Sequence, residues 1–145
     1  MKVIIKYLLS AVFVFLLNTF NTFANESIKI GLLVPLTGEY DDIGKSIIQS
    51  TRMAINKISD SKILILPRDT KSDPKETLKK VEKLYAEGIK IFIGPVFNEN
   101  LKGLGKFEDV IFLSLTNKIL NNPKNVISAG INAKSQFDAI KKYQK

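Results

Sequence analysis

The sequence of 145 residues contains no cysteine, no histidine and no tryptophan. Without cysteine it can form no disulfide, no zinc–thiolate site and no lipid-modified cysteine. Without histidine it lacks the commonest general base and the commonest metal ligand, so Ser-His-Asp and Cys-His catalytic arrangements are excluded. A Gly-x-Ser-x-Gly nucleophile elbow is also missing. We therefore expect a protein that is not an enzyme, with no catalytic residue, no metal site and no cofactor.

Arginine is scarce, although the chain is basic. The formal net charge is +8, and among the 22 basic residues only Arg52 and Arg68 are arginines. The lysines are spread along the chain between acidic residues, whereas nucleic-acid-binding proteins more often gather Arg and Lys with aromatics on one face. We interpret the charge as mostly solvated surface and expect no nucleic-acid partner. An affinity for anionic membrane or wall surfaces stays open.

The first 24 residues have the three-part pattern of an export signal. Lys2 and Lys6 form a basic start, residues 7–17 are an apolar run, and a polar stretch ends in residues 22–24 (TFA). Small side chains at this place suit signal peptidase, so we predict cleavage after about Ala24. The apolar run is shorter than the ~20 residues that span a bilayer, which disfavours the alternative of an uncleaved anchor. After cleavage we expect no stable membrane insertion and a net charge of +6, because both lysines are lost.

The rest of the chain alternates apolar runs with amphipathic segments. The apolar runs predict strands at residues 28–34, 62–66, 89–93, 110–115 and 126–130. Helical spacing of apolar residues predicts helices at residues 42–58, 74–87, 133–143 and, more weakly, 100–107. Strands that are uniformly apolar are typical of a parallel sheet covered by helices on both faces. The expected fold is therefore α/β, with right-handed crossovers between parallel strands.

The second helix carries clear end signals. Asp73 has the character of an N-cap, Pro74 suits the first helical position, and Glu76 completes a capping box. Gly88 suits the left-handed position after the helix. Residues 67–74 between the second strand and this helix are expected to form a loop.

One segment comes close to a phosphate-binding loop. Residues 38–46 (GEYDDIGKS) follow a strand and open a helix, but five residues separate the two glycines where a P-loop has four. Three acidic residues in the segment would also repel a polyphosphate. A nucleotide-dependent enzyme is therefore the least favoured hypothesis, and Asp41 and Asp42 are better explained as complements of a helix dipole.

Four blocks in order resemble type 1 periplasmic solute-binding proteins of the leucine/isoleucine/valine-binding kind. They are residues 28–58, 69–74 (DTKSDP), 87–95 (EGIKIFIGP) and 110–117 (VIFLSLTN). The resemblance implies the first lobe of that fold, in a periplasmic, non-catalytic protein that delivers a small polar ligand such as an amino acid to an ABC transporter permease. The family has two lobes and two to three times this length. We therefore expect residues 25–145 to be an incomplete N-terminal lobe, apparently truncated, with uncovered apolar surface and no hinge closure.

The resemblance also implies where a ligand would bind. In the family, the loops after the first, third and fourth strands of the first lobe hold the ligand, in agreement with the general behaviour of parallel sheets. The corresponding candidates are Thr37, Gly38, Tyr40, Val96, Phe97, Asn98, Ser114, Thr116 and Asn117. Amino-acid binders usually carry small hydroxyl residues near Asn98 and Lys118 and an aromatic near Ile43, and this sequence keeps none of the three. Asn98 can still donate its amide, and Lys118 can neutralise an anion.

A second branch of the same fold matches some blocks equally well. The segments LLVPLTGEY, IGPVFNEN and LSLTN, followed by NVISAGI, are similar to penicillin-binding protein activators. That resemblance implies contact with a cell-wall synthase in place of solute transport. A positive mature chain would suit an anionic wall, whereas the best-known activators carry a lipidated cysteine that this chain lacks.

Overall fold

The computed structural model describes residues 27–118, 121–130 and 133–143. The predicted export signal, residues 1–24, lies outside these ranges. Within them, none of the helices combines the length and the hydropathy that a bilayer crossing requires.

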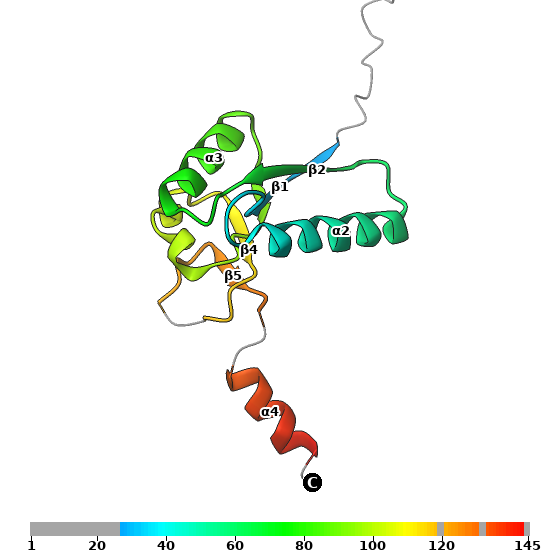
Figure 1. Cartoon of the computed structure of the whole chain (residues 1–145), viewed down its shortest axis with the longest axis vertical. Coiled ribbons are helices and arrows are strands. Elements are labelled where there is room, and N and C mark those ends of the chain that lie inside the picture. Colours follow the sequence, from blue (N-terminus) through cyan, green and yellow to red (C-terminus); the bar gives the residue numbers. More distant parts are fainter. Residues whose placement is uncertain (1–26, 119–120, 131–132, 144–145) are drawn as a thin grey trace, which may run out of the picture.

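A five-stranded parallel sheet forms the centre of the molecule (Figure 1). Its strands run in the order β2-β1-β3-β4-β5, and every neighbouring pair is parallel. This confirms the predicted α/β class. The strands span β1 Ile28–Val34, β2 Ile63–Asp69, β3 Ile91–Ile93, β4 Ile111–Ser114 and β5 Val126–Ser128.

Helices lie on both faces of this sheet. Helix α2 (Asp41–Ile58) lies on one face. Helix α3 (Pro74–Ala86) and two short 3-10 helices, η1 (Asn98–Leu101) and η2 (Leu104–Lys106), cover the other. The last helix, α4 (Ala133–Tyr143), stands clear of the sheet in Figure 1.

The hydrophobic core lies on the α3 side. Val81 and Leu84 of α3 are fully buried against Phe92 and Phe112, whose rings stack with their centroids 5.1 Å apart. Gly31 of β1 makes room for this stack, since a Cβ there would lie 2.5 Å from the Phe92 ring. A close-packed core of this kind is what orients the strands and their terminal loops.

The α2 side of the sheet is only partly covered. Helix α2 packs over β1 and β2, while aliphatic side chains of β3, β4 and β5 on this face stay exposed. Ile111 is 52% exposed and Ile127 is 56% exposed. In the register of the sheet Ile91 lies beside Ile111, and Leu113 lies beside Ile127. The uncovered apolar surface expected from the sequence is therefore present.

Two local predictions are wrong. Strand β2 continues through Pro67 to Asp69, where the sequence predicted a loop. Strand β2 lies at the edge of the sheet and pairs only with β1. Proline has no backbone N–H, but no strand lies on the outer side of β2 to accept one, so Pro67 is tolerated there. The single weak helix over residues 100–107 is two 3-10 pieces, separated by Gly103 with a φ of 82°.

The ends of α3 follow the predicted signals. Asp73 is the N-cap, and its Oδ1 accepts a hydrogen bond of 2.7 Å from the backbone N–H of Glu76. The Asp73 N–H donates to the carbonyl of Thr70, so the reciprocal half of a capping box is replaced by a turn. Gly88 has a φ of 86°, the left-handed conformation expected after the helix.

Candidate functional site

The loops that follow β1, β3 and β4 meet at one edge of the sheet, because all strands are parallel and their carboxyl ends lie together. These are the three loops that carry the predicted binding residues. The end of β2 reaches the same edge. In sheets of this kind ligands bind outside the carboxyl ends of the strands, so a ligand site is expected at this edge.

Asp69, at the end of β2, organises the loop after β1. Its carboxylate accepts hydrogen bonds from the backbone N–H of Leu36 at 2.8 Å and from the Thr37 hydroxyl at 2.7 Å. It also accepts the N–H of Lys71 at 2.9 Å. The Thr37 hydroxyl therefore already donates its proton to a hydrogen bond within the protein. Asp69 was not among the predicted site residues, although it begins the DTKSDP block.

The ionised form of Asp69 is favoured. Partial burial by itself raises the pKa of the carboxyl, but the hydrogen bonds from Thr37, Leu36 and Lys71 outweigh it, and the pKa lies below its ordinary value. The negative charge of Asp69 is therefore used to hold two adjoining loops together.

Tyr40 and Phe97 connect the first loop with the third-strand loop. Their ring centroids are 4.8 Å apart with a tilt of 56°, a favourable geometry for an aromatic pair. Tyr40 is exposed and Phe97 is half-buried. Behind them Gly44 of α2 presses against the carbonyl of Pro35, because a Cβ on Gly44 would lie 1.6 Å from that oxygen. The first turn of α2 therefore packs directly against the loop that follows β1.

The loop after β4 uses its hydroxyl groups internally. Ser114 is buried and donates to the carbonyl of Pro95 at 3.0 Å, and its oxygen accepts the N–H of Thr116. The hydroxyl of Thr116, which is also buried, accepts the N–H of Lys118. Asn117 and Lys118 are exposed at the tip. The loop therefore presents its last two residues to solvent and turns its hydroxyl groups inward.

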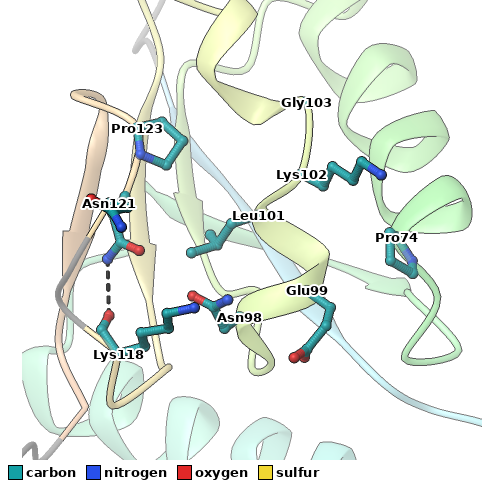
Figure 2. Close-up of a pocket in the computed structure, with 10 residues that line it drawn as sticks. Pro74, Asn98, Glu99, Leu101, Lys102, Gly103, Lys118, Asn121 and Pro123 are labelled. Carbon is teal, nitrogen blue, oxygen red and sulfur yellow. Dashed lines mark hydrogen bonds between the residues drawn. The ribbon is translucent and has the colours of Figure 1, made fainter.

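A polar cavity of about 570 Å³ opens beside these loops (Figure 2). Asn98 of η1 and Lys118 of the β4 loop face each other across it, and the Lys118 side chain extends toward Asn98. The side-chain amide of Asn122 donates to the Lys118 carbonyl at 2.9 Å and so links two residues that line the cavity. The other lining residues are Pro74, Glu99, Leu101, Lys102, Gly103, Asn121 and Pro123.

The cavity offers two ammonium groups and several amides. Lys118 and Lys102 supply positive charge, Glu99 supplies one negative charge, and Asn98, Asn121 and Asn122 supply amide donors and acceptors. This set suits a small polar molecule with an anionic group. In the described part of the chain no cluster of three acidic side chains could hold a metal ion.

The structure thus brings together Asn98 and Lys118, which the sequence placed on separate loops. Val96, Phe97 and Asn98 are half-buried, while Thr37, Gly38, Tyr40 and Asn117 are exposed at the same edge. Sequence reasoning missed Lys102, Asn121 and Asn122. They lie on the irregular segments before and after β4, where no periodicity indicates which side chains face inward.

The segment that came close to a P-loop has a different role. Lys45 forms ion pairs with Asp41 at 2.6 Å and with Asp42 at 3.6 Å. The hydrogen bond from Lys45 to Asp41 is the main reason that the pKa of Lys45 is raised. The lysine is therefore paired along the helix, as an ordinary surface residue is.

A family model described as periplasmic binding protein matches residues 27–143. The uncharacterized protein MJ1266 of Methanocaldococcus jannaschii is 34% identical over 98 residues, which is 60% of this chain and 24% of that protein.

Two solved structures show the same fold. The C-domain of LpoA from Haemophilus influenzae, a regulator of PBP1A, superposes with a TM-score of 0.64 and 22% identity over 81% of this chain and 38% of that chain. An ABC-type branched-chain amino acid transporter of Rhodopseudomonas palustris gives a TM-score of 0.63 and 17% identity over 73% of this chain and 33% of that chain. The chain spans about a quarter to two fifths of the length of these proteins.

Proposed function

The chain belongs to the periplasmic binding protein family, and on this basis we propose that it is an exported solute-binding protein of an ABC-type uptake system. Its ligand is a small polar molecule with an anionic group, such as an amino acid, and it acts by binding without catalysis. In this proposal residues 25–145 supply the part of the first lobe that contacts the ligand.

The observation that carries this proposal is the polar cavity at the carboxyl edge of the sheet. Lys118 and Asn98 lie on opposite walls of it, and within the described residues neither side-chain end forms an ion pair or a hydrogen bond. An ammonium and an amide that face one cavity can together hold a carboxylate by charge-assisted hydrogen bonds. The cavity volume of about 570 Å³ lies within the range of small-molecule sites.

The nine residues predicted as ligand contacts then divide into two groups. Asn98 lines the cavity and is proposed as a direct contact. Six others lie outside its lining and are proposed as further ligand contacts at the same edge of the sheet: Thr37, Gly38, Tyr40, Val96, Phe97 and Asn117. Ser114 and Thr116 are buried, so their proposed part is to shape the β4 loop. Lys118 and Lys102 are added as the positive charges of the site.

The test is isothermal titration and thermal unfolding of residues 25–145 with a panel of amino acids and small organic anions. A ligand that binds only the folded state raises the unfolding midpoint by mass action. Lys118→Met should weaken binding of an anionic ligand by about tenfold or more, because a charged hydrogen bond is worth about 1.5–3 kcal/mol. Lys57→Met, at the exposed end of α2, is the matched control and should bind normally.

The proposal fails if no member of the panel moves the midpoint, or if Lys57→Met weakens binding as much as Lys118→Met does. Export is tested separately. N-terminal sequencing of the protein recovered from the periplasm should begin at about Asn25, and an uncleaved N-terminus would contradict the proposed signal.

A second candidate is a regulator of a cell-wall synthase. It is favoured by the extent of the match to the LpoA C-domain, which covers more of this chain than the transport protein does, and by the positive charge of the mature chain. Under this alternative thermal unfolding is cooperative, but solutes do not change its midpoint temperature. A purified penicillin-binding synthase would then bind the chain directly, with a measurable dependence on salt concentration.

A further inference from the structure

Three charged side chains line the polar cavity, and they do not pair with one another. Lys102 and Lys118 are positive, Glu99 is negative, and all three are exposed. Within the described residues none of these side chains forms an ion pair. Elsewhere on the surface opposite charges within reach do pair, as Lys90 does with Asp109 at 2.6 Å. The cavity therefore presents charges that the protein itself does not neutralise.

Glu99 and Lys102 belong to the same turn. Glu99 lies in η1, and the backbone N–H of Lys102 donates to the Glu99 carbonyl at 3.2 Å. Side chains three residues apart in a regular 3-10 helix lie on the same side, where opposite charges can pair. Lys102 instead leaves the helix with an extended backbone, at a φ of −60° and a ψ of 123°. Figure 2 shows the two side chains pointing in different directions, so both charged groups stay available to a ligand.

The wall that carries η1 is anchored from behind. Leu101 is buried in the core, and Asn100 is only 1% exposed. The Asn100 amide donates to the Thr77 hydroxyl oxygen at 3.0 Å, and that hydroxyl donates to the Asp73 carbonyl at 2.8 Å. These contacts fix η1 against the first turn of α3. Because the wall is ordered before a ligand arrives, binding costs less conformational entropy.

The opposite wall is held in a similar way. The backbone N–H of Lys118 donates to the Thr116 hydroxyl oxygen at 3.2 Å, and the Lys118 carbonyl accepts the Asn122 amide at 2.9 Å. The Lys118 side chain reaches toward Asn98, whereas Lys102 extends on the other side of the cavity (Figure 2). The two ammonium groups therefore approach a ligand from different walls.

Two separate ammonium groups and one carboxylate select the charges of the ligand. Together the two lysines and Glu99 give the lining a net charge of +1. A neutral amino acid can pair with Glu99 and one lysine, but it leaves the other lysine without a partner. A plain dicarboxylate can pair with both lysines, but it brings negative charge close to Glu99, which is unfavourable. An amino acid with a second carboxylate has a partner for each of the three groups.

Resting on the solute-binding function above, we propose that the ligand is an acidic amino acid. Lys118 and Asn98 hold one carboxylate by charge-assisted hydrogen bonds. Lys102 holds the second carboxylate, and Glu99 accepts the ammonium group. Lys102 and Glu99 thus determine specificity, because they separate the acid from its amide and from a dicarboxylate without an amino group.

Isothermal titration of the processed protein with L-glutamate, L-glutamine, L-aspartate and L-asparagine tests the second carboxylate. Each acid is compared with its own amide, which has a similar shape and lacks the second charge. In the better-bound pair the acid should bind about fivefold more tightly, as one exposed ion pair predicts. Lys102→Met should remove this preference without changing the affinity for the amide. Lys124→Met removes the same charge outside the cavity lining, so it is the matched control and should keep the preference.

The outcomes separate this proposal from the solute-binding function. Amides that bind as tightly as their acids would overturn the acidic ligand and leave solute binding in place, and so would binding of other solutes alone. A protein that binds none of the four and no other member of the wider panel would overturn both. A Lys102→Met variant that weakens acid and amide equally would contradict the role given to Lys102.

Glutarate tests the contact with the ammonium group, because it has both carboxylates of glutamate and no amino group. The wild type should prefer L-glutamate by about fivefold, and Glu99→Gln should abolish the preference. Glu108→Gln, an exposed residue outside this lining, is the matched control. Thermal unfolding without ligand confirms that each variant is folded. Equal binding of glutarate and L-glutamate by the wild type would overturn the proposed contact of Glu99.

Discussion

Asp69 shows how a single side chain can organise the loops of a site. One of its oxygens accepts two backbone N–H groups, from Leu36 and Lys71, and the other accepts the Thr37 hydroxyl. The carboxylate therefore replaces backbone partners that neither loop can supply by itself. Ser114 acts in a similar way for the loops after β3 and β4. Around this edge, the polar residues nearest the strands hold the protein together, while Asn117 and Lys118 farther out are exposed.

We predict that Asp69→Asn lowers the free energy of unfolding by about 1–3 kcal/mol at neutral pH, because three hydrogen bonds lose their charged acceptor. The pKa of Asp69 is lower in the folded protein than its ordinary value of 3.8. Its contribution is therefore complete above that value and is lost as the pH falls through the folded pKa. Denaturant unfolding from pH 7 down to pH 3 measures the difference between wild type and variant.

That difference should be constant above about pH 5 and should shrink in the acid range. Thr37→Val, which removes only one donor, is the control and should cost less than Asp69→Asn. A difference that grows as the pH falls would contradict the stabilising role of the charge.

Short-range sequence signals predicted the ends of helix α3 correctly. The Asp73–Pro74 start of α3 and the left-handed Gly88 after it are both as predicted. The same kind of reasoning failed at Pro67, because tolerance of proline in a strand depends on whether the strand has one neighbour or two. It also failed between Asn98 and Lys106, where two 3-10 pieces are held by packing of Leu101 and Leu104 in the core.

We predict that Asp73→Ala lowers the free energy of unfolding by about 0.5–2 kcal/mol, since the N–H of Glu76 loses its acceptor. Asp73→Asn keeps an oxygen in the same place and should cost much less. Chemical denaturation of the two variants measures this. Equal losses in both would mean that the charge at the helix start, and not the cap hydrogen bond, carries the effect.

At the scale of the whole molecule the two faces of the sheet differ. The α3 side contains a closed core with the stacked Phe92 and Phe112, while the α2 side leaves the aliphatic side chains of Ile111 and Ile127 exposed. The side chains of α4 from Lys134 to Tyr143 are all exposed. Stability is therefore expected to be concentrated in β1, β3, β4 and α3.

Hydrogen exchange should report this division. In dilute protein, amides of β1 and β4 should exchange slowest and amides of α4 should exchange within the fastest class, because α4 has no packed partner in a single copy. Mass spectrometry of peptic fragments measures the rates. Slow exchange of α4 at every dilution would show that it packs on its own chain.

The kinds of elements and the parallel character of the sheet were predictable from the sequence, because they depend on local periodicity, on apolar runs and on the alternation of strands with helices. The resemblance of residues 28–117 to solute-binding proteins indicated the family, which the match over residues 27–143 confirms. Which residues would contact a ligand remains a prediction.

Only the tertiary structure decided how the loops meet. It placed Lys118 opposite Asn98, turned the Ser114 and Thr116 hydroxyl groups inward, and left Ile111 and Ile127 uncovered. These features depend on contacts between residues far apart in the chain, and nothing in the local spacing of side chains encodes them. Periodicity identifies a strand and its apolar character, but whether that surface is covered depends on where the other elements pack.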